Sequence, residues 1–379
     1  MKKGLIPEKV RNYKVYVPGK PIEELQREKG LDKIVKMASN ENPNGPSPLA
    51  VEAMRKALEK SNYYPDSSSY YLRKKLSNML GFPEDNFLVG PGTALIIKWL
   101  AKALLEEGDN AITSEKTFLM YTVAVEQSEG ILKKIPMRED LSYNLEEILS
   151  AIDEQTKLIF IANPNNPTGT MIRKKEMDEF IEKVPKDVIV VLDEAYREYV
   201  DREDYPEAVD YIKQGKKNVV ALRTFSKIYG LAGLRIGYAI TIHEEIIDAY
   251  YRVAPPFPVT SLAQVAAIAA LDDKEFLRKS FEINQEGKKF LYREFDRLGI
   301  KYVKTQTNFI YFIPPLPPQE LKTRLEDKGI IIRYLKAFEA PEALRVTIGR
   351  PEENEYFIKC LEEILKEEGI EREVSGNSH

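Results

Sequence analysis

Cysteine and histidine are almost missing from this sequence. Among its 379 residues Cys360 is the single cysteine, and His243 and His379 are the two histidines. An internal disulfide and a thiolate metal site are therefore excluded, two histidines leave almost no material for a Ser-His-Asp triad or a multi-histidine site, and no metal centre is expected. Acid–base chemistry must come from lysine, aspartate, glutamate or tyrosine, or from a cofactor that supplies chemistry of its own.

The sequence also lacks long apolar runs and a large excess of charge of either sign. Its longest apolar stretches, such as residues 158–162 and 188–192, fall far short of the ~18 residues that suggest a membrane-spanning helix. With 60 acidic against 56 basic residues, the net charge is −4, which provides no broad basic surface for nucleic acid. The first residues contain no apolar signal region, so we expect a cytoplasmic protein that binds small molecules and neither nucleic acid nor a membrane.

The residue pattern predicts an α/β fold with a mostly parallel sheet. Short apolar runs that end in Gly, Asn or Asp alternate with segments of helical period. The clearest strand candidates are residues 111–113, 158–161, 188–192, 219–222 and 236–240. Thr93 is expected to cap a buried helix over residues 95–105, and residues 352–368 are expected to form a closing helix.

A change of pattern after residue 251 predicts a second domain, and the length of the chain also favours two domains. The Pro-rich segment 254–258 is typical of a hinge. A long segment of helical period through Leu298 and a strand candidate at 308–313 follow it. We therefore expect the C-terminal part to form a smaller domain of its own.

Lys227 lies in a Gly-punctuated loop that follows a predicted strand. A lysine fixed at a strand end can form an imine with an aldehyde. Thr224, Ser226 and Arg235 add two hydroxyl groups and a permanent cation, which suit a phosphate monoester. A lysine after a strand is by itself usually a solvated surface residue, and only these neighbours favour a site.

Two further strand ends carry polar side chains. Asp193 ends an apolar run, where a buried charge needs a cationic partner such as a protonated pyridine nitrogen. The alternative is a carboxylate that caps a helix or pairs with an arginine. Asn166 follows the strand candidate 158–161 in a Pro-rich segment, which on its own predicts only a turn.

A fourth candidate is the loop of Gly92, Thr93 and Ala94, which leads into the predicted buried helix. Backbone N–H groups at the start of a helix favour an anion such as phosphate. The loop is not a dinucleotide-binding fingerprint, because Leu95 stands where the third glycine of that motif is required. A simple turn into the helix is the alternative.

Taken in order, these motifs resemble those of the fold type I aminotransferases, which use pyridoxal 5′-phosphate. The matching segments are NPTG at 166–169, DEAY at 193–196, SK at 226–227 and GLR at 233–235. Within that superfamily the chain is most similar to the histidinol-phosphate aminotransferases, through YVPG at 16–19, ASNENP at 38–43, YPD at 64–66 and LRVTIG at 344–349. The resemblance implies a large cofactor-binding domain over 30–255, with helices flanking the central sheet, and a small α+β domain formed by 1–29 and 256–379.

The resemblance implies a role for each candidate residue. Lys227 is expected to hold the cofactor covalently and to move a proton between substrate and cofactor. Asp193 is expected to keep the pyridine nitrogen protonated, and Phe118 to stack on the ring. The other implied cofactor contacts are Asn166, Tyr196, Thr224, Ser226, Arg235, the loop of Gly92, Thr93 and Ala94, and Tyr64 from the partner subunit of a homodimer with shared sites.

The same resemblance implies the substrates. Arg345 is expected to bind an α-carboxylate, and Arg333 and Tyr16 a substrate phosphate, with Asn42 as a further contact. The alternative for either arginine is an ordinary ion pair. The implied reaction is transamination between L-histidinol phosphate and 2-oxoglutarate, giving imidazole acetol phosphate and L-glutamate, as in histidine biosynthesis.

Two departures from the family pattern lie beside the predicted cofactor. Residues 92–95 read GTAL and lose two carboxylates, and residues 116–118 read KTF in place of Pro-Thr-Tyr. They leave open an aminotransferase for aromatic or other amino acids, or a lyase similar to threonine-phosphate decarboxylase. A non-catalytic binding protein is disfavoured, because five site residues are retained together: Lys227, Asp193, Asn166, Tyr196 and Arg235.

Overall fold

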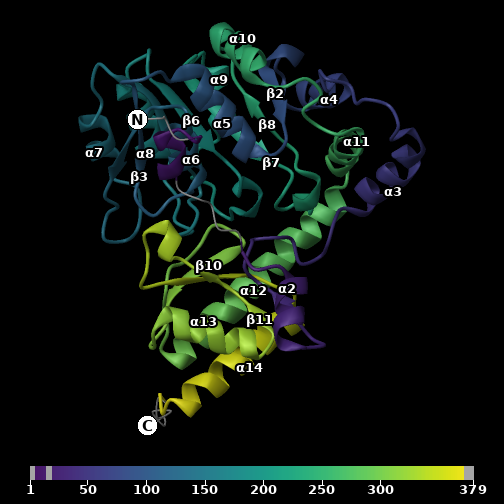
Figure 1. Cartoon of the computed structure of the whole chain (residues 1–379), viewed down its shortest axis with the longest axis vertical. Helices are drawn as coiled ribbons and strands as arrows, with labels where there is room; N and C mark the ends of the chain where they lie inside the picture. Colours follow the sequence, from purple (N-terminus) through teal and green to yellow (C-terminus); the bar gives the residue numbers. More distant parts are fainter. Residues whose placement is uncertain (1–4, 14–18, 371–379) are drawn as a thin grey trace.

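The computed structural model describes residues 5–13 and 19–370, which form two lobes joined by a long helix (Figure 1). The larger lobe is built on a seven-stranded sheet and the smaller lobe on a four-stranded sheet. Helix α12 (Lys274–Leu298) runs from one lobe to the other. Tyr16, one of the predicted substrate contacts, lies outside the described residues.

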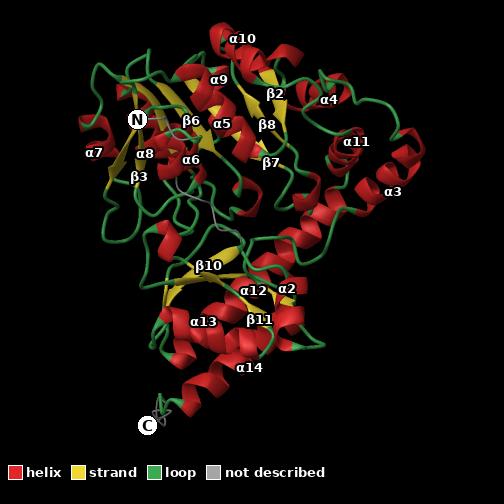
Figure 2. Cartoon of the chain, in the orientation of Figure 1, coloured by secondary structure: helices red, strands yellow, loops and turns green. Residues whose placement is uncertain are grey.

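The central sheet of the large lobe is mostly parallel, as predicted (Figure 2). In spatial order its strands are β2 (Phe87–Gly90), β8 (Gly237–Ile240), β7 (Val219–Thr224), β6 (Ile189–Asp193), β5 (Thr156–Ala162), β3 (Asn110–Ser114) and β4 (Ile131–Ile135). Strand β8 runs antiparallel to both of its neighbours, and the pairs among β4, β3, β5, β6 and β7 are parallel. Two strands of this sheet were not predicted from the sequence: β2, which has four residues, and β4, whose lysines interrupt its apolar pattern.

Helices cover both faces of this sheet. Alternate side chains along the central strands belong to two separate apolar clusters, as expected of strands buried on both sides. The cluster on one face contains α5 (Thr93–Leu104), α6 (Met120–Gln127) and α10 (Glu244–Val253). The cluster on the other face contains α3 (Pro48–Ala57), α4 (Tyr70–Leu80), α7 (Leu145–Ser150), α8 (Lys174–Lys183), α9 (Ala208–Lys213) and α11 (Ser261–Ala270).

The small lobe is an α+β unit, as predicted. Its antiparallel sheet has the order β12 (Arg333–Tyr334), β13 (Leu344–Thr347), β10 (Phe309–Ile313) and β9 (Lys301–Tyr302), and β1 (Val35–Lys36) pairs with β11 (Ile330–Ile331). The second half of α12 shares one core with α13 (Pro318–Asp327) and α14 (Pro351–Glu367).

The other described elements are α1 (Glu8–Asn12), α2 (Ile22–Lys29) and the 3-10 turns η1 (Leu58–Lys60), η2 (Glu84–Asn86), η3 (Arg197–Tyr199), η4 (Ala232–Leu234) and η5 (Lys336–Phe338).

The boundary between the lobes differs from the predicted one at both ends. Ala263 and Ala267 of α11 are buried in the core of the large lobe, so the chain leaves this lobe within α12 and not at 255/256. Val35 and Met37 belong to the core of the small lobe, so its N-terminal segment extends beyond residue 29. The Pro-rich segment 254–258 is a loop between α10 and α11, because prolines stop a helix without determining which core the next helix joins.

The predicted strands and helices are present, with ends shifted by one or two residues. One local prediction is wrong: Gly92, and not Thr93, is the N-cap of α5. Its φ of 78° lies in the left-handed region, which glycine adopts without steric cost. Cys360 is buried in α14, and no helix in the described part of the chain is long and apolar enough to cross a membrane.

Candidate active site

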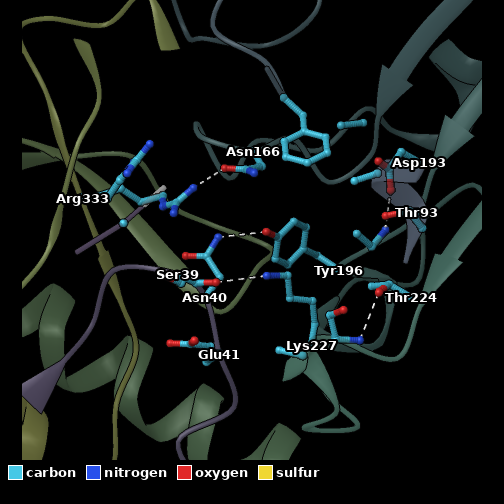
Figure 3. A pocket seen from close by; sticks show the side chains of 18 of the residues that line it. Ser39, Asn40, Glu41, Thr93, Asn166, Asp193, Tyr196, Thr224, Lys227 and Arg333 are labelled. Carbon is cyan, nitrogen blue, oxygen red and sulfur yellow. Dashed lines mark hydrogen bonds between the residues drawn. The ribbon is translucent and has the colours of Figure 1, made fainter. Parts of the chain in front are cut away.

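A cavity of about 370 Å³ lies between the two lobes and collects most of the predicted site residues (Figure 3). The large lobe contributes the ends of β5, β6 and β7, the start of α5 and the loop before α6. The small lobe contributes side chains of β12, η5 and β13. The predicted residues that line it are Thr93, Ala94, Phe118, Asn166, Asp193, Tyr196, Thr224, Ser226, Lys227, Arg235, Arg333 and Arg345.

The strand ends meet because β5, β6 and β7 are parallel neighbours. Ala162 pairs with Asp193, and Asp193 pairs with Leu222. The carboxyl ends of parallel strands share one edge of the sheet, where open α/β folds bind their ligands. The loops that follow therefore place Asn166, Asp193 and Lys227 around one cavity.

Lys227 holds its ammonium group in a setting that favours loss of the proton. Its Nζ donates a hydrogen bond to the Ser39 carbonyl oxygen at 3.1 Å (Figure 3). Burial, reinforced by the positive charge of Arg345, lowers the pKa of Lys227 to about 7. A large share of the neutral amine is thus present near neutral pH, and the neutral amine is the form that attacks a carbonyl carbon.

Asp193 is buried at the end of β6 with two hydrogen-bond donors. The Tyr121 hydroxyl donates to its Oδ2 at 3.0 Å, and the Ala195 backbone N–H donates to its Oδ1 at 3.1 Å. Burial raises the pKa of Asp193 to about 6, against the effect of these two donors. A cation bound beside this carboxyl group would favour the ionised form, as a protonated pyridine nitrogen does.

Tyr121 is a site residue that the sequence analysis missed. It is fully buried in α6, and its ring stacks on Phe160 with the centroids 4.9 Å apart. Burial raises the pKa of Tyr121 well above its ordinary value, so its hydroxyl keeps the proton that it donates to Asp193. No sequence signal pointed to it, because a tyrosine within a buried helix is indistinguishable from an ordinary core residue.

The other end of the cavity suits an anion. Gly92 precedes α5, whose first backbone N–H groups have no partner within the helix. A Cβ at Gly92 would come within 2.6 Å of Arg235 Nη2, so the guanidinium group occupies the space that a side chain would need. Arg235 donates to the Ala232 carbonyl oxygen at 2.9 Å and to Ser226 Oγ at 3.4 Å. Thr224 lies alongside, since its Oγ1 accepts the Ser226 N–H at 3.0 Å.

These three groups fit the three functional parts of pyridoxal 5′-phosphate. The buried carboxyl group of Asp193 suits a pyridinium nitrogen, and the amine of Lys227 suits an aldehyde carbon. The α5 N-terminus with Arg235 suits a phosphate. Phe118 lines the same cavity and offers an aromatic face.

Asn40 and Tyr196 form a pair beside Lys227. The Asn40 amide donates to the Tyr196 hydroxyl at 2.9 Å, and the Lys227 ammonium lies 5.7 Å from the centre of the Tyr196 ring. Asn42, which was predicted to contact substrate, does not line this cavity: its amide donates to the Ile228 carbonyl oxygen at 2.7 Å and to Ser280 Oγ at 2.9 Å. The matched segment ASNENP therefore supplies Asn40 to the site, while Asn42 ties the chain to α12.

The two predicted arginines reach the cavity from neighbouring strands of the small lobe. Arg333 of β12 and Arg345 of β13 are direct partners in the antiparallel register. Arg345 is buried, and its guanidinium group donates to Asn166 Oδ1 and, at 2.8 Å, to the Ala38 carbonyl oxygen. Arg333 is half-buried on the same side of the cavity (Figure 3).

Tyr64 does not line the cavity of its own chain. It is 83% exposed and stacks on Phe257, with the ring centroids 4.7 Å apart. A contribution of Tyr64 to the site of a partner subunit stays a prediction.

A network of buried charges lies beneath the strand ends. Arg223, the residue before Thr224, donates to Glu194 Oε2 at 2.8 Å and to Glu207 Oε2 at 2.7 Å. Glu194 follows Asp193 and also accepts the Ala208 N–H at 2.7 Å. The alternative considered for Asp193, an ion pair with an arginine, is thus realised by its neighbour Glu194.

Across the described ranges, no cluster of three or more histidine, cysteine, aspartate or glutamate side chains could hold a metal ion.

Comparison with known proteins agrees with this geometry. The family model for aminotransferases of class I and II matches residues 32–361. Histidinol-phosphate aminotransferase from Moorella thermoacetica is 46% identical over 94% of this chain and 92% of that protein, and histidinol-phosphate aminotransferase 2 from Carboxydothermus hydrogenoformans is 42% identical over 96% and 99%. The crystal structure of histidinol-phosphate aminotransferase from Sinorhizobium meliloti in complex with pyridoxal-5′-phosphate covers 96% of this chain and 98% of that chain, with a TM-score of 0.87 and 26% identity. The chain therefore belongs to the class I and II aminotransferases, enzymes that transfer amino groups with pyridoxal 5′-phosphate.

Proposed function

We propose that this enzyme transfers the amino group between L-histidinol phosphate and 2-oxoglutarate, as in histidine biosynthesis. The observation that carries the proposal is the direct pairing of Arg333 and Arg345 across β12 and β13, on the wall of the cavity that holds Lys227. Two neighbouring guanidinium groups provide one position for a carboxylate and one for a phosphate dianion. The names of the relatives from Moorella and Carboxydothermus support the same substrate.

One site must serve both substrates in turn. In L-glutamate a carboxylate is bonded to the carbon that carries the amino group, and in L-histidinol phosphate a phosphate group is one methylene further away. Arg345 sits deep beside Asn166 and suits the carboxylate, while the more open Arg333 suits the larger phosphate. The two positions follow from the register of the strands.

The cofactor, when bound, supplies an aldehyde carbon and a ring that accepts electrons from the substrate α-carbon. Lys227 provides the amine that attacks a carbonyl carbon and, once released, takes and returns the proton at the substrate α-carbon. Asp193 in its ionised form holds a proton on the ring nitrogen. The Tyr196 hydroxyl accepts a hydrogen bond from the Asn40 amide, and Tyr196 and Lys227 line the same cavity.

The proposal includes a homodimer in the cytoplasm with Tyr64 reaching the site of the partner subunit. Exposed aromatic and apolar side chains close to Tyr64 in the sequence, together with the Phe257 ring stacked on it, support such a contact, because exposed apolar surface marks interaction sites. They are Leu58, Tyr63, Tyr70, Tyr71 and Phe257. Light scattering of the purified protein measures the mass, and a mixture of Lys227→Ala and Tyr64→Ala subunits tests sharing, since mixed dimers should regain activity at one of two sites.

The substrate is tested by titrating the holoenzyme separately with L-glutamate and with L-histidinol phosphate while its visible absorbance is recorded. We expect both compounds to bleach the absorbance of the bound cofactor. If L-glutamate alone bleaches the absorbance, the protein is an aminotransferase but L-histidinol phosphate is not its substrate. This result would favour an aminotransferase for aromatic or other amino acids. Release of carbon dioxide without any need for a keto acid would instead identify a decarboxylase.

A further inference from the structure

The turn between β12 and β13 places one aromatic ring against both predicted substrate arginines. Phe338 ends the 3-10 turn η5 and is 3% exposed. The centre of its ring lies 5.6 Å from Arg333 Cζ and 5.7 Å from Arg345 Cζ. A guanidinium group within about 6 Å of an aromatic face is attracted by the ring, more strongly where water is excluded. Phe338 is therefore in a position to set where Arg333 lies and, together with the Phe309 ring at 5.0 Å from Arg345 Cζ, where Arg345 lies.

The same turn is attached to the large lobe by two ion pairs. Lys116 Nζ lies 2.8 Å from Glu342 Oε1, and that oxygen also accepts the Tyr311 hydroxyl at 2.9 Å. Lys134 of β4 pairs with Glu339, directly after Phe338. Each pair joins a lysine of the large lobe to a glutamate of the turn.

One residue of each ion pair has a left-handed backbone conformation. Lys116 has a φ of 45° and Glu339 a φ of 62°, in the left-handed region where a side chain costs energy and glycine does not. One residue of each ion pair thus holds an unfavourable conformation. Such strain persists only where the surrounding contacts maintain it.

Apolar contacts complete the connection between the lobes. Phe338, Leu335 and Ala343 of the turn form a small buried cluster, against which Leu119 and Leu141 of the large lobe pack. Phe338 also lines a void of only about 10 Å³ between the turn and the loop that carries Lys116. The ring is thus held between the cavity and the large lobe.

We infer that Phe338 is a specificity-determining residue: its ring positions Arg333 and Arg345 for the substrate anion, and the pairs Lys116–Glu342 and Lys134–Glu339 hold the ring in place. The inference rests on the proposed function, because it takes these two arginines as the groups that bind the substrate. Phe338 acts through the arginines and has no part in proton transfer. Loss of the ring therefore alters KM and leaves kcat nearly unchanged.

Substitution of Phe338 in the holoenzyme tests this role. Phe338→Leu keeps an apolar side chain in the turn, and Phe338→Tyr keeps the aromatic face. We expect Phe338→Leu to raise KM for L-histidinol phosphate about tenfold, the size of one or two partly desolvated cation–π contacts. KM for L-glutamate should rise less, because Arg345 keeps its hydrogen bonds to Asn166 and the Ala38 carbonyl oxygen. Phe338→Tyr should behave as the wild type does.

Three results would overturn the inference: an unchanged KM for L-histidinol phosphate, an equal rise for both substrates, or a Phe338→Tyr variant as impaired as Phe338→Leu. If the wild type does not turn over L-histidinol phosphate at all, the proposed function fails by itself. The role of Phe338 can then be tested by measuring how strongly inorganic phosphate inhibits the reaction with L-glutamate. Its inhibition constant should rise in Phe338→Leu and not in Phe338→Tyr, and an unchanged constant refutes the role.

The ion pairs are tested by the double variant Glu339→Gln, Glu342→Gln. Its KM for L-histidinol phosphate should rise about two- to fivefold at low salt, as expected for two partly exposed pairs, and less at high salt. Glu182→Gln is the matched control, because Glu182 pairs with Lys216 at 2.6 Å within the large lobe and the lysine is similarly half-exposed. A double variant that matches this control would show that the pairs do not hold the ring.

Discussion

The large-lobe wall of the cavity rests on one fully buried ion pair, whereas the small-lobe wall rests on half-exposed pairs. Beneath Asp193 and Thr224, the Arg223 and Glu194 side chains are 3% and 1% exposed. Across the cavity, Lys116 and Glu342 are 24% and 41% exposed. Buried pairs are hardly screened by salt and are costly to break, whereas exposed pairs contribute little and weaken with salt.

This difference matches what each wall holds. The large-lobe wall carries the residues assigned to a cofactor that stays bound through many turnovers, and a dry charge network suits a fixed geometry. The small-lobe wall carries Arg333 and Arg345, which are assigned to substrates that come and go. Arg345 is fixed by buried hydrogen bonds to Asn166 and the Ala38 carbonyl oxygen, whereas weaker, salt-sensitive ion pairs hold the turn that contacts Arg333.

The largest expected effect falls on the large-lobe wall, at Lys227. Lys227→Ala removes both the amine that attacks the carbonyl carbon and the proton carrier, so turnover should fall at least about a thousandfold. The visible absorbance of the bound cofactor should also shift, while the far-ultraviolet circular dichroism stays that of the wild type. Normal turnover in this variant would remove the basis for the proposed chemistry.

Arg223→Met tests whether the buried network is as strong as its burial suggests. It leaves the buried Glu194 without its cation, while Glu207 keeps its pair with Arg197, and should lower the free energy of unfolding by about 3 to 5 kcal/mol. Urea unfolding of the apoprotein measures this loss. Arg278→Met is the control, because Arg278 pairs with Glu275 and Glu282 on the exposed surface of α12 and should cost no more than about 1 kcal/mol. Equal losses would show that the buried pair beneath the large-lobe wall is no stronger than an exposed ion pair.

On the small-lobe wall, Arg333→Ala should separate the two substrates. We expect KM for L-histidinol phosphate to rise about ten- to a hundredfold, the range of a lost charge-assisted hydrogen bond, and KM for L-glutamate to change much less. Steady-state kinetics with both substrates decides this. Equal changes for both would show that Arg333 does not bind the phosphate.

The smallest expected effect on the large-lobe wall concerns Asp193 and its donor Tyr121. The pKa of Asp193 is about 6, so as pH falls through 6 the carboxylate takes up a proton and loses its attraction for a pyridinium cation. Tyr121→Phe removes a donor to the ionised form, which raises the pKa of Asp193 further. At pH 6 the variant should bind pyridoxal 5′-phosphate about three- to tenfold more weakly than the wild type, with a smaller difference at pH 8. The dissociation constant of the apoprotein measured at both pH values checks this, and a pH-independent ratio would contradict it.

Much of the large lobe was predictable from the sequence. Each of β5, β6 and β7 contains a run of at least four apolar residues; Asp193 ends β6, and Asn166 and Lys227 follow the ends of β5 and β7 by four and three residues. Parallel packing then brings Asn166, Asp193 and Lys227 together with no further information. The domain boundary was misplaced, because the prolines at 254–258 end a helix but do not determine which core α11 joins.

The sequence by itself thus determined the α/β class, the strand ends and the residues suited to the cofactor, because these depend on local patterns. Only the tertiary structure decided that Tyr121 bonds to Asp193, that Asn40 and not Asn42 faces the cavity, and that one ring at Phe338 lies against two arginines. Each of these contacts joins side chains whose meeting depends on helix rotation, strand register or the packing of one lobe on the other. No local pattern in the chain encodes those quantities.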